Sequence, residues 1–424
     1  MKPYLVELRR SPLRWWFPLL VALDLAALFG RSRWWIGEWA QTSVQAQIPS
    51  FYFAPVLAAA AAWAGGRSAR HNLHDQMDSA SRPSWQIQAA QLSSTLTYGL
   101  GAYLVGVLVA AATSWSTAGP GFLWPGYLVL GAALLVTFAS AGHLVGSWSR
   151  TQFTAPVLVG LGSLIAIAWL GDPTSLGLYV LAGNPFTAAS LPAVLARSAL
   201  ALAAFLVAVT LTRRSPLATE GGWPNPARRT GTVVCCLALV VAGAGLVATR
   251  PVQVDRAAPG KPLCTSGAPA LCLWPDDRKY LSQAEAMGER VRQLPQGLFV
   301  IPDAFYEKGL RSDEQYRFED FYILEGSMWD PAQSLAGSIL TASRPKNCPL
   351  PDGARFTQDY VQSSGELMMW LAMRIFGGGR PPEMHGGPPG VDLDAIAQVI
   401  HRPEQIQLEW AKQRIDKIQH AYCG

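Results

Sequence analysis

The stretch Trp63–Leu92, WAGGRSARHNLHDQMDSASRPSWQIQAAQL, decides how the chain is organised. It is a polar segment between two apolar ones, and Arg67 and Arg70 follow directly on an alanine-rich run. Basic residues at the end of an apolar helix mark a cytoplasmic boundary. Leu73 and Met77 lie one helical turn apart, which predicts a short amphipathic helix on the membrane surface. Such a helix is suited to contact a soluble partner, although a plain cytoplasmic loop on the headgroups fits the spacing equally well.

The composition divides the chain into two unlike halves. Of its 424 residues, 50% are hydrophobic and only 15% are charged, whereas soluble domains carry about 25% charged residues. Residues 1–250 hold 16 of the 34 basic and seven of the 29 acidic residues, so the remainder holds 18 and 22. We therefore expect a membrane part followed by a water-exposed, mildly acidic domain. The basic excess then reports membrane topology rather than nucleic-acid binding.

The first half contains seven apolar segments, and we expect each to span a membrane as a helix. They are residues 15–30, 51–64, 92–113, 126–145, 155–170, 193–211 and 232–248. Residues 1–14 form a basic amphipathic segment for the inner surface, and 213–231 form a cytoplasmic linker. Counted this way, the inner connections carry 12 basic residues, against four in the outer ones: Arg31, Arg33, Arg197 and Arg250. This asymmetry predicts an inside N-terminus and, after seven spans, an outside C-terminus in the plasma membrane.

The connection at residues 171–192, between the fifth and sixth segments, is unusually apolar. Its Leu-Tyr-Val-Leu core lies between Gly and Pro residues, which favours short re-entrant helices dipping into the outer face. Non-helical backbone at that depth is tolerated only where it packs against protein or lines a cavity. An ordinary outer loop fits the pattern equally well.

The domain at residues 250–424 is large enough to bury its own core, and we expect it to be mainly α-helical. Helices are predicted at residues 281–294, 357–376, 392–400 and 403–422, with a short strand at 297–301 and a loop at 380–390. Ser282 and Glu285 have the spacing of a capping box for the first of these helices. The resulting fold class is an all-α polytopic membrane protein followed by a mainly helical extracytoplasmic domain.

Four of the six cysteines lie in the polar half, and outside the cytoplasm they would normally be paired. Three connectivities are possible. We favour Cys264–Cys272, which closes a small Ser/Gly/Pro loop, and Cys348–Cys423, which would tie back the last helix. A zinc site is the alternative, but no CxxC or HxxxH spacing supports it.

Motifs for catalysis are sparse. The chain has no GxxxxGK[ST] loop, HExxH, GxSxG or GxGxxG motif, so we expect no ATP hydrolysis and no metal site on this chain. A hydrolase could be built from polar residues of the second half, but so could any solvated surface; these are Asp303, Glu307, Glu319, Asp320 and His385. Asp24, in the first apolar segment, is a functional candidate because ionisable groups at membrane depth are costly. Pairing with Arg31 or Arg33 near the outer surface is the alternative.

The motifs ELRRSPLRWW, ending at Trp16, and GGRSARHNLHDQMDSASRPSWQIQAAQL resemble those of ABC-2 type transporter permeases of actinobacterial type. The resemblance covers roughly residues 1–212. It implies a six-span core at 15–212, a seventh span at 232–249, and a dimer of like or unlike permease subunits. It also implies that segment 63–92 holds a coupling helix docked in a groove on a separate ATPase subunit, which binds ATP and Mg²⁺. The residues in or beside that contact would be Arg70, His71, Leu73, His74, Met77 and Arg82.

Two features depart from the family pattern. The centre of the coupling segment reads His74-Asp75-Gln76-Met77 where relatives are more acidic, which leaves the docking residues open, since a solvated face also suits His71 and His74. A seventh span then leads to a domain whose CTSGAPALCLWPDD stretch is similar to outer domains fused to some actinobacterial permeases. We expect the permease subunit of an exporter for an amphipathic, peptide or lipid-like cargo. A membrane-anchored outer sensor or binding protein is the alternative, and an outer hydrolase the third.

Overall fold

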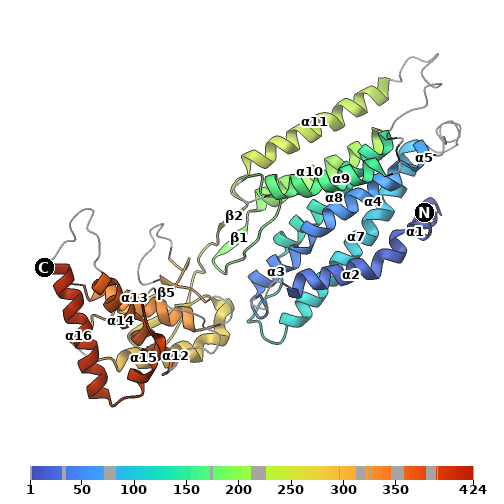
Figure 1. Ribbon diagram of the computed structural model, residues 1–424. Helices are drawn as coiled ribbons and strands as arrows, with labels where there is room; N and C mark the ends of the chain where they lie inside the picture. Colours follow the sequence, from blue (N-terminus) through green and yellow to red (C-terminus); the bar gives the residue numbers. More distant parts are fainter. Residues whose placement is uncertain are drawn as a thin grey trace. The chain divides into compact units, whose positions relative to one another are not determined.

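The computed structural model divides the chain into two compact units, whose elements are drawn in Figure 1. The helical unit comprises Met1–Ala118 and Phe122–Asp255, and the second unit comprises Gly119–Gly121 and Arg256–Gly424. The structure describes residues 2–30, 35–70, 83–149, 151, 153–171, 175–211, 226–295, 297–311, 320–323, 327–344, 358–378, 388 and 390–423.

The helical unit is built from long apolar helices that follow one short amphipathic helix. Its helices are α1 (Lys2–Arg10), α2 (Leu13–Gly30), α3 (Trp39–Gln47), α4 (Pro49–Gly65), α5 (Arg67–Arg70), α7 (Ser84–Ser114), α8 (Pro125–Trp148), α9 (Thr154–Leu170), α10 (Leu191–Thr210) and α11 (Pro226–Ala248). Among the described residues, five helical stretches are long and apolar enough to cross a membrane: α2, α3 with α4, α7, α8 and α10. This is the architecture of an all-α membrane protein. Helix α9 and the apolar part of α11 are shorter, so the count of seven spans stays a prediction.

The second membrane-length stretch begins at Trp39, not at residue 51 as the apolar pattern predicted. Helix α3 carries polar residues, which lower its hydropathy below that of a typical span. Most of these side chains are nevertheless buried and hydrogen-bonded. Thr42 Oγ1 donates to the Trp35 carbonyl at 2.7 Å, and Gln45 Nε2 donates to the Leu28 carbonyl at 3.0 Å. Internal hydrogen bonding makes such polar side chains compatible with an apolar environment.

Helix α4 lies at the centre of the unit, in contact with α7, α8 and α9. Its closest neighbour is α8, because small residues on both helices let the two backbones approach. A Cβ added at Gly142 or Gly146 would collide with the Ala58 or Ala62 carbonyl of α4, respectively. The spacing of four residues on each helix is the small-xxx-small pattern of packed membrane helices.

The connection between α9 and α10 contains no helix in its described part, residues 175–190, so the predicted short helices are not found there, and its depth in a membrane stays a prediction. Strand β1 (Thr187–Ala189) pairs antiparallel with β2 (Gln253–Asp255), which follows α11. Glycine and proline interrupt any helical run here, and Gly177 has a φ of +59°. In place of helical hydrogen bonds, the β1–β2 pairing and hydrogen bonds with buried side chains satisfy backbone polar groups of this connection. Irregular backbone inside a membrane protein needs such internal partners.

The second unit combines helices with a small mixed sheet. Its strands are β3 (Leu263–Cys264), β4 (Ala270–Leu273), β5 (Ala304–Glu307) and β6 (Asp320–Phe321), in that order across the sheet. Strands β3 and β4 pair antiparallel, whereas β4–β5 and β5–β6 pair parallel. The helices are η2 (Pro275–Tyr280), α12 (Leu281–Arg292), α13 (Trp329–Ala342), α14 (Gln358–Phe376), α15 (Leu393–Ile400) and α16 (Glu404–Cys423). Helix α12 thus provides the crossover between the parallel strands β4 and β5.

This unit has a hydrophobic core of its own. Trp370 of α14 and the strand residues Phe305 and Phe321 are almost fully buried, together with residues from α12, α13 and α15. A core shared by sheet and helices supports independent folding of this unit.

Predictions for the second unit were right for α12, α14, α15 and α16, whereas α13 was not predicted. Helices α14, α15 and α16 lie where the periodicity placed them. The strand predicted at 297–301 is wrong, because the strand is Ala304–Glu307. Ser282 does not cap α12, since the 3-10 helix η2 runs directly into it and Tyr280 holds the cap position. Residues 250–255 belong to the helical unit, because β2 pairs with β1.

Candidate functional site

The predicted coupling residues lie mostly outside the described residues; these are His71, Leu73, His74, Met77 and Arg82. Arg70, the last residue of α5, is described. Its Nη2 donates to the Trp63 carbonyl at 2.6 Å, and its guanidinium lies 5.1 Å from the centre of the Trp63 ring. Burial, with the Arg67 charge as a second cause, lowers the pKa of Arg70. Arg70 therefore folds back over the end of α4.

Helix α1 is attached to this same end of the helical unit. Arg67 Nη1 lies 2.9 Å from Glu7 Oε2, an ion pair with both side chains largely shielded from solvent. On α7, Tyr98 Oη donates to the Leu8 carbonyl at 2.9 Å. Helix α1 is thus bonded both to α5 and to α7. No local sequence pattern indicated this contact, because Glu7 and Arg67 are separated by 60 residues.

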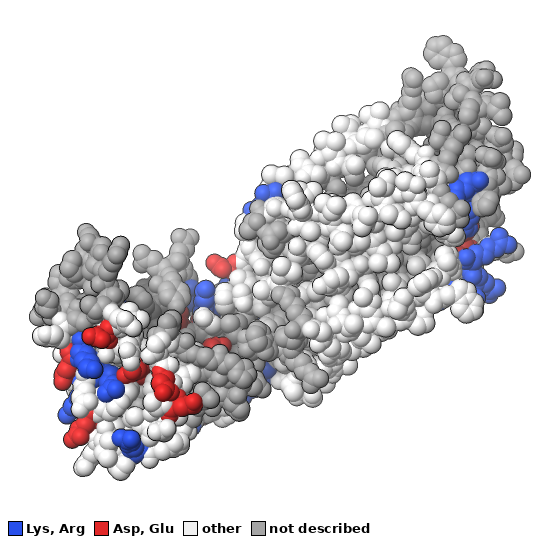
Figure 2. All heavy atoms as spheres, in the orientation of Figure 1, with Lys and Arg blue, Asp and Glu red and all other residues white. Residues whose placement is uncertain are grey.

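Basic side chains gather at this end. The described ones are Arg9, Arg10, Arg14, Arg67 and Arg70. Figure 2 shows blue residues clustered at this end, with few charged residues along the rest of the helical unit in that view. The ends of α8 and α10 meet as well, since Trp148 Nε1 donates to the Leu211 carbonyl at 2.9 Å. The distribution is that expected of a cytoplasmic end.

Asp24 lies in the interior of the helical unit and is fully buried. Its carboxylate sits directly against Gly106 of α7, where a Cβ would overlap it. Neither carboxylate oxygen has a side-chain hydrogen-bond partner among the described residues, and its polar neighbour is the backbone of Gly106. Arg31 and Arg33, the alternative partners, lie outside the described residues. A buried acid without a charged partner is costly, which makes Asp24 a functional candidate.

A cavity of about 580 Å³ lies beside the junction of α3 and α4. Its walls come from α2, α3, α4 and the β1 connection, and they are mostly apolar; the residues are Ala26, Ala27, Gly30, Gln47, Ile48, Phe51, Tyr52, Tyr179 and Leu181. Phe51 packs edge-on against both tyrosines. Volume and lining are typical of sites for small apolar ligands.

Gln47 is the polar member of this cavity wall. Its Oε1 accepts a hydrogen bond from the Val180 backbone at 3.3 Å, which fixes which end of the amide is oxygen. The Nε2 group is buried and has no partner among the described residues. Gln47 is therefore a fully buried amide behind a mostly apolar cavity wall. Nothing in the local sequence pattern distinguished Gln47 from its polar neighbours.

Arg197 was counted among outer-loop charges, but the structure places it inside α10 with 2% of its surface exposed. Its guanidinium donates to the carbonyls of Leu176, at 2.6 Å, and Gly177, at 3.0 Å. It also donates to Thr249 Oγ1 at 2.7 Å. Arg197 therefore ties the β1 connection to the end of α11.

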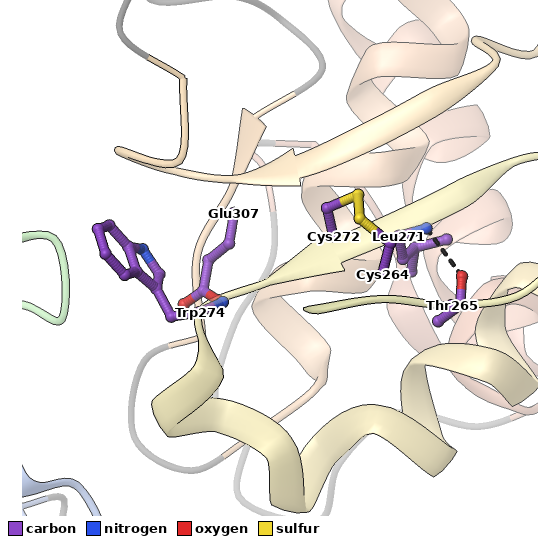
Figure 3. Close-up of a disulfide and its surroundings, with 6 residues drawn as sticks. All are labelled: Cys264, Thr265, Leu271, Cys272, Trp274 and Glu307. Atoms are coloured by element: carbon purple, nitrogen blue, oxygen red, sulfur yellow. Dashed lines mark hydrogen bonds between the residues drawn. A yellow bond between two sulfur atoms is a disulfide. The ribbon is translucent and has the colours of Figure 1, made fainter. Parts of the chain in front are cut away.

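In the second unit, Cys264 and Cys272 form a disulfide between directly paired positions of β3 and β4 (Figure 3). Beside it, Thr265 Oγ1 accepts from the Leu271 amide at 2.9 Å. Cys348 and the side chain of Cys423 lie outside the described residues, so their pairing stays a prediction. Among the described residues, no group of three or more His, Cys, Asp or Glu is placed to hold a metal ion.

The hydrolase candidates are not brought together as a site in the part of the chain that the structure describes. Glu307 is buried, and its Oε2 accepts from the Trp274 amide at 2.8 Å, so it holds the turn between β4 and η2 (Figure 3). Asp303 accepts through its backbone carbonyl from Ala270, and Asp320 lies in β6. Glu319 and His385 lie outside the described residues.

Comparison with known proteins adds no relative to this picture. No protein-family model, no curated protein and no solved structure matches the chain.

Proposed function

We propose that this chain is the membrane-spanning subunit of an ATP-driven exporter, with a separate ATPase subunit supplying ATP hydrolysis. Seven helices would cross the plasma membrane, with α1 and α5 inside and the second unit outside. Two copies, or this chain and a related one, would form the transport unit. The cargo would be amphipathic, such as a lipid or an apolar peptide.

The observation that carries the proposal is the chain of contacts that joins α5 to α1 and, through α1, to α7. The polar segment 63–92 leaves α4 through α5, and the Arg67–Glu7 pair joins it to α1. Helix α1 in turn packs on α7. A partner pressing on this segment would therefore move α4, α1 and α7 together, because these elements are bonded to one another at that end.

The cavity beside Gln47 supports the choice of cargo. It lies next to the junction of α3 and α4, inside one membrane-length helical stretch. Its mostly apolar, partly aromatic walls suit an apolar chain.

The direct test is the effect of the coupling segment on a partner ATPase. Met77→Asp places a charge in the segment expected to dock, so it should abolish the change in ATP hydrolysis that this subunit causes. Thr151→Asp is the matched control, since it adds the same charge to an exposed position in another connection. Equal stimulation by wild type and Met77→Asp would refute docking through this segment.

The separate core of the second unit favours a second candidate function, a membrane-anchored binding protein or sensor. An isolated segment 256–424 that folds and binds a cell-wall component or peptide would support it. If that binding occurs while no ATPase associates with the full chain, the helices are an anchor only.

A further inference from the structure

A groove of about 350 Å³ runs along the helical unit between α2 and α4, away from the Gln47 cavity. Both helices pack on α7, whereas they make little contact with each other. The groove lies where α2 and α4 are not in contact, and Ser94 and Thr95 of α7 form part of its wall. It is separate from the Gln47 cavity, and three of its lining residues, Trp63, Ala64 and Arg67, belong to the polar segment 63–92. Its role as a binding groove does not depend on the proposed function.

The groove changes in polarity along its length. At one end it is lined by Ser11 and Arg67, at the end of the unit that also carries α1. Towards the other end it is lined by Leu19, Leu23 and Val56, all partly exposed apolar side chains. From Leu13 to Leu23, within α2, the helix rises about 15 Å. A polar, cationic end and an apolar remainder match a molecule with one charged head and one long apolar chain.

The basic residues at this end of the groove favour a ligand with an anionic head group. Arg67 lines the groove, and the neighbouring residues 2–14 add exposed Arg9, Arg10 and Arg14. Glu7, the one acidic residue between residues 2 and 14, pairs with Arg67, so the net positive charge at this end comes from Arg9, Arg10 and Arg14. Basic residues at a membrane surface attract anionic lipids.

The same charges disfavour a second copy of this chain as the occupant. In a twofold contact, the same surface faces itself across the axis. With the axis along the helices, two such basic ends would meet, with like charges opposed. We therefore propose that the α2–α4 groove binds one anionic glycerophospholipid, with an acyl chain along Leu19, Leu23 and Val56 and its phosphate near Arg67.

The test uses the full chain in lipid nanodiscs that contain phosphatidylglycerol or phosphatidylcholine bearing the same photoreactive acyl chain. After irradiation, peptide mapping should find the label concentrated in residues 13–23 and 56–64 when the probe is phosphatidylglycerol. Labelling there by phosphatidylcholine should be about fivefold weaker, the factor expected for one nearby basic residue. Equal labelling by both lipids, or labelling spread over all exposed apolar faces, would overturn the proposal.

Two pairs of variants locate the site. Ala60→Phe fills the groove from its wall and should remove the groove label, while Leu202→Phe, on an exposed face of α10, should not. The double variant Glu7→Gln/Arg67→Gln removes the pair without changing the net charge and should remove the preference for phosphatidylglycerol, while Arg10→Gln, outside the groove lining, should lower that preference only in part. Since this double variant leaves the groove volume intact, it tests the head contact even if Ala60→Phe does not fold. A Leu19→Cys variant that crosslinks quantitatively between two copies and excludes the lipid label would assign the groove to a second copy instead.

Discussion

Arg67 on α5 pairs with Glu7 on α1 at 2.9 Å, joining the start of the polar segment to the N-terminal amphipathic helix. Because the pair is partly shielded, its strength exceeds that of a fully exposed surface pair, but its effect on stability is still modest. In the proposed function, this pair would transmit displacement of the polar segment to α1.

The Glu7–Arg67 pair can be tested by reversing it. Glu7→Arg or Arg67→Glu alone places like charges together, so we expect the partner-dependent change in ATP hydrolysis to be lost. Stability should fall by only about 1 kcal/mol, as is usual for such pairs. The double swap should restore coupling. ATPase assays and thermal unfolding of the same preparations separate the two effects, and a double swap as defective as the single variants would contradict a paired role.

The close approach of α4 and α8 predicts a strong effect of enlarging Gly142 or Gly146. Either residue changed to Leu must push the α4 backbone away, so we expect a loss of about 1–3 kcal/mol or more. Gly162 of α9 has open space where a Cβ would lie, so Gly162→Leu is the matched control. Detergent-induced unfolding measures both, and equal losses would show that the helices do not pack as described.

Arg197 should control the order of the β1 connection. Arg197→Met removes the donors to Leu176 and Gly177 and leaves buried carbonyls unsatisfied, each at a cost of about 1–3 kcal/mol. Hydrogen exchange around residues 175–189 should accelerate strongly, while exchange in α4 stays slow. Ser198→Ala, which removes only a bond within α10, is the control. Unchanged exchange in Arg197→Met would show that strand pairing alone holds the connection.

Asp330, in the first turn of α13, gives a pH dependence with a definite sign. Burial raises the pKa of Asp330, so the folded state holds this proton more tightly than the unfolded state. Stability from this group is present below its unfolded pKa, about 3.9, and is lost as the pH rises through the folded value.

Asp330→Asn should therefore stabilise the second unit at neutral pH, with the advantage shrinking near pH 4. Asp359→Asn, an exposed first-turn residue of α14, is the control and should lack this gain. Pulse proteolysis of the full chain, followed at α13 and α14, gives the comparison. A neutral-pH loss of stability in Asp330→Asn would mean that the charged form is favoured by the start of the helix.

The sequence predicted the parts of the fold that depend on periodicity. Long apolar runs located α2, α7, α8 and α10, and amphipathic spacing located α14 and α16. Helix α3 was missed because Thr42 and Gln45 read as polar, although tertiary hydrogen bonds satisfy them. The sheet of the second unit was missed because its strands are two to four residues long, too short to show an alternating pattern.

The candidate sites depend on contacts between distant parts of the chain, which no local pattern encodes. Asp24 stood out because one charge in an apolar run is visible in the sequence. Its neighbour Gly106, by contrast, is one of 39 glycines. The roles of Gln47 and Arg197 follow from Val180, Leu176 and Gly177, which lie in an irregular connection whose path only the folded structure defines.

The central claim, that this chain works with a separate ATPase, is tested most directly by purification. The full chain carrying an affinity tag, expressed in a related host and extracted in a mild detergent, should retain a P-loop ATPase in a stoichiometric amount. The Met77→Asp variant, extracted in parallel, should lose that ATPase while retaining its fold. Repeated absence of any ATPase from the wild-type preparation, with another protein or a polymer bound to the second unit, would contradict the account.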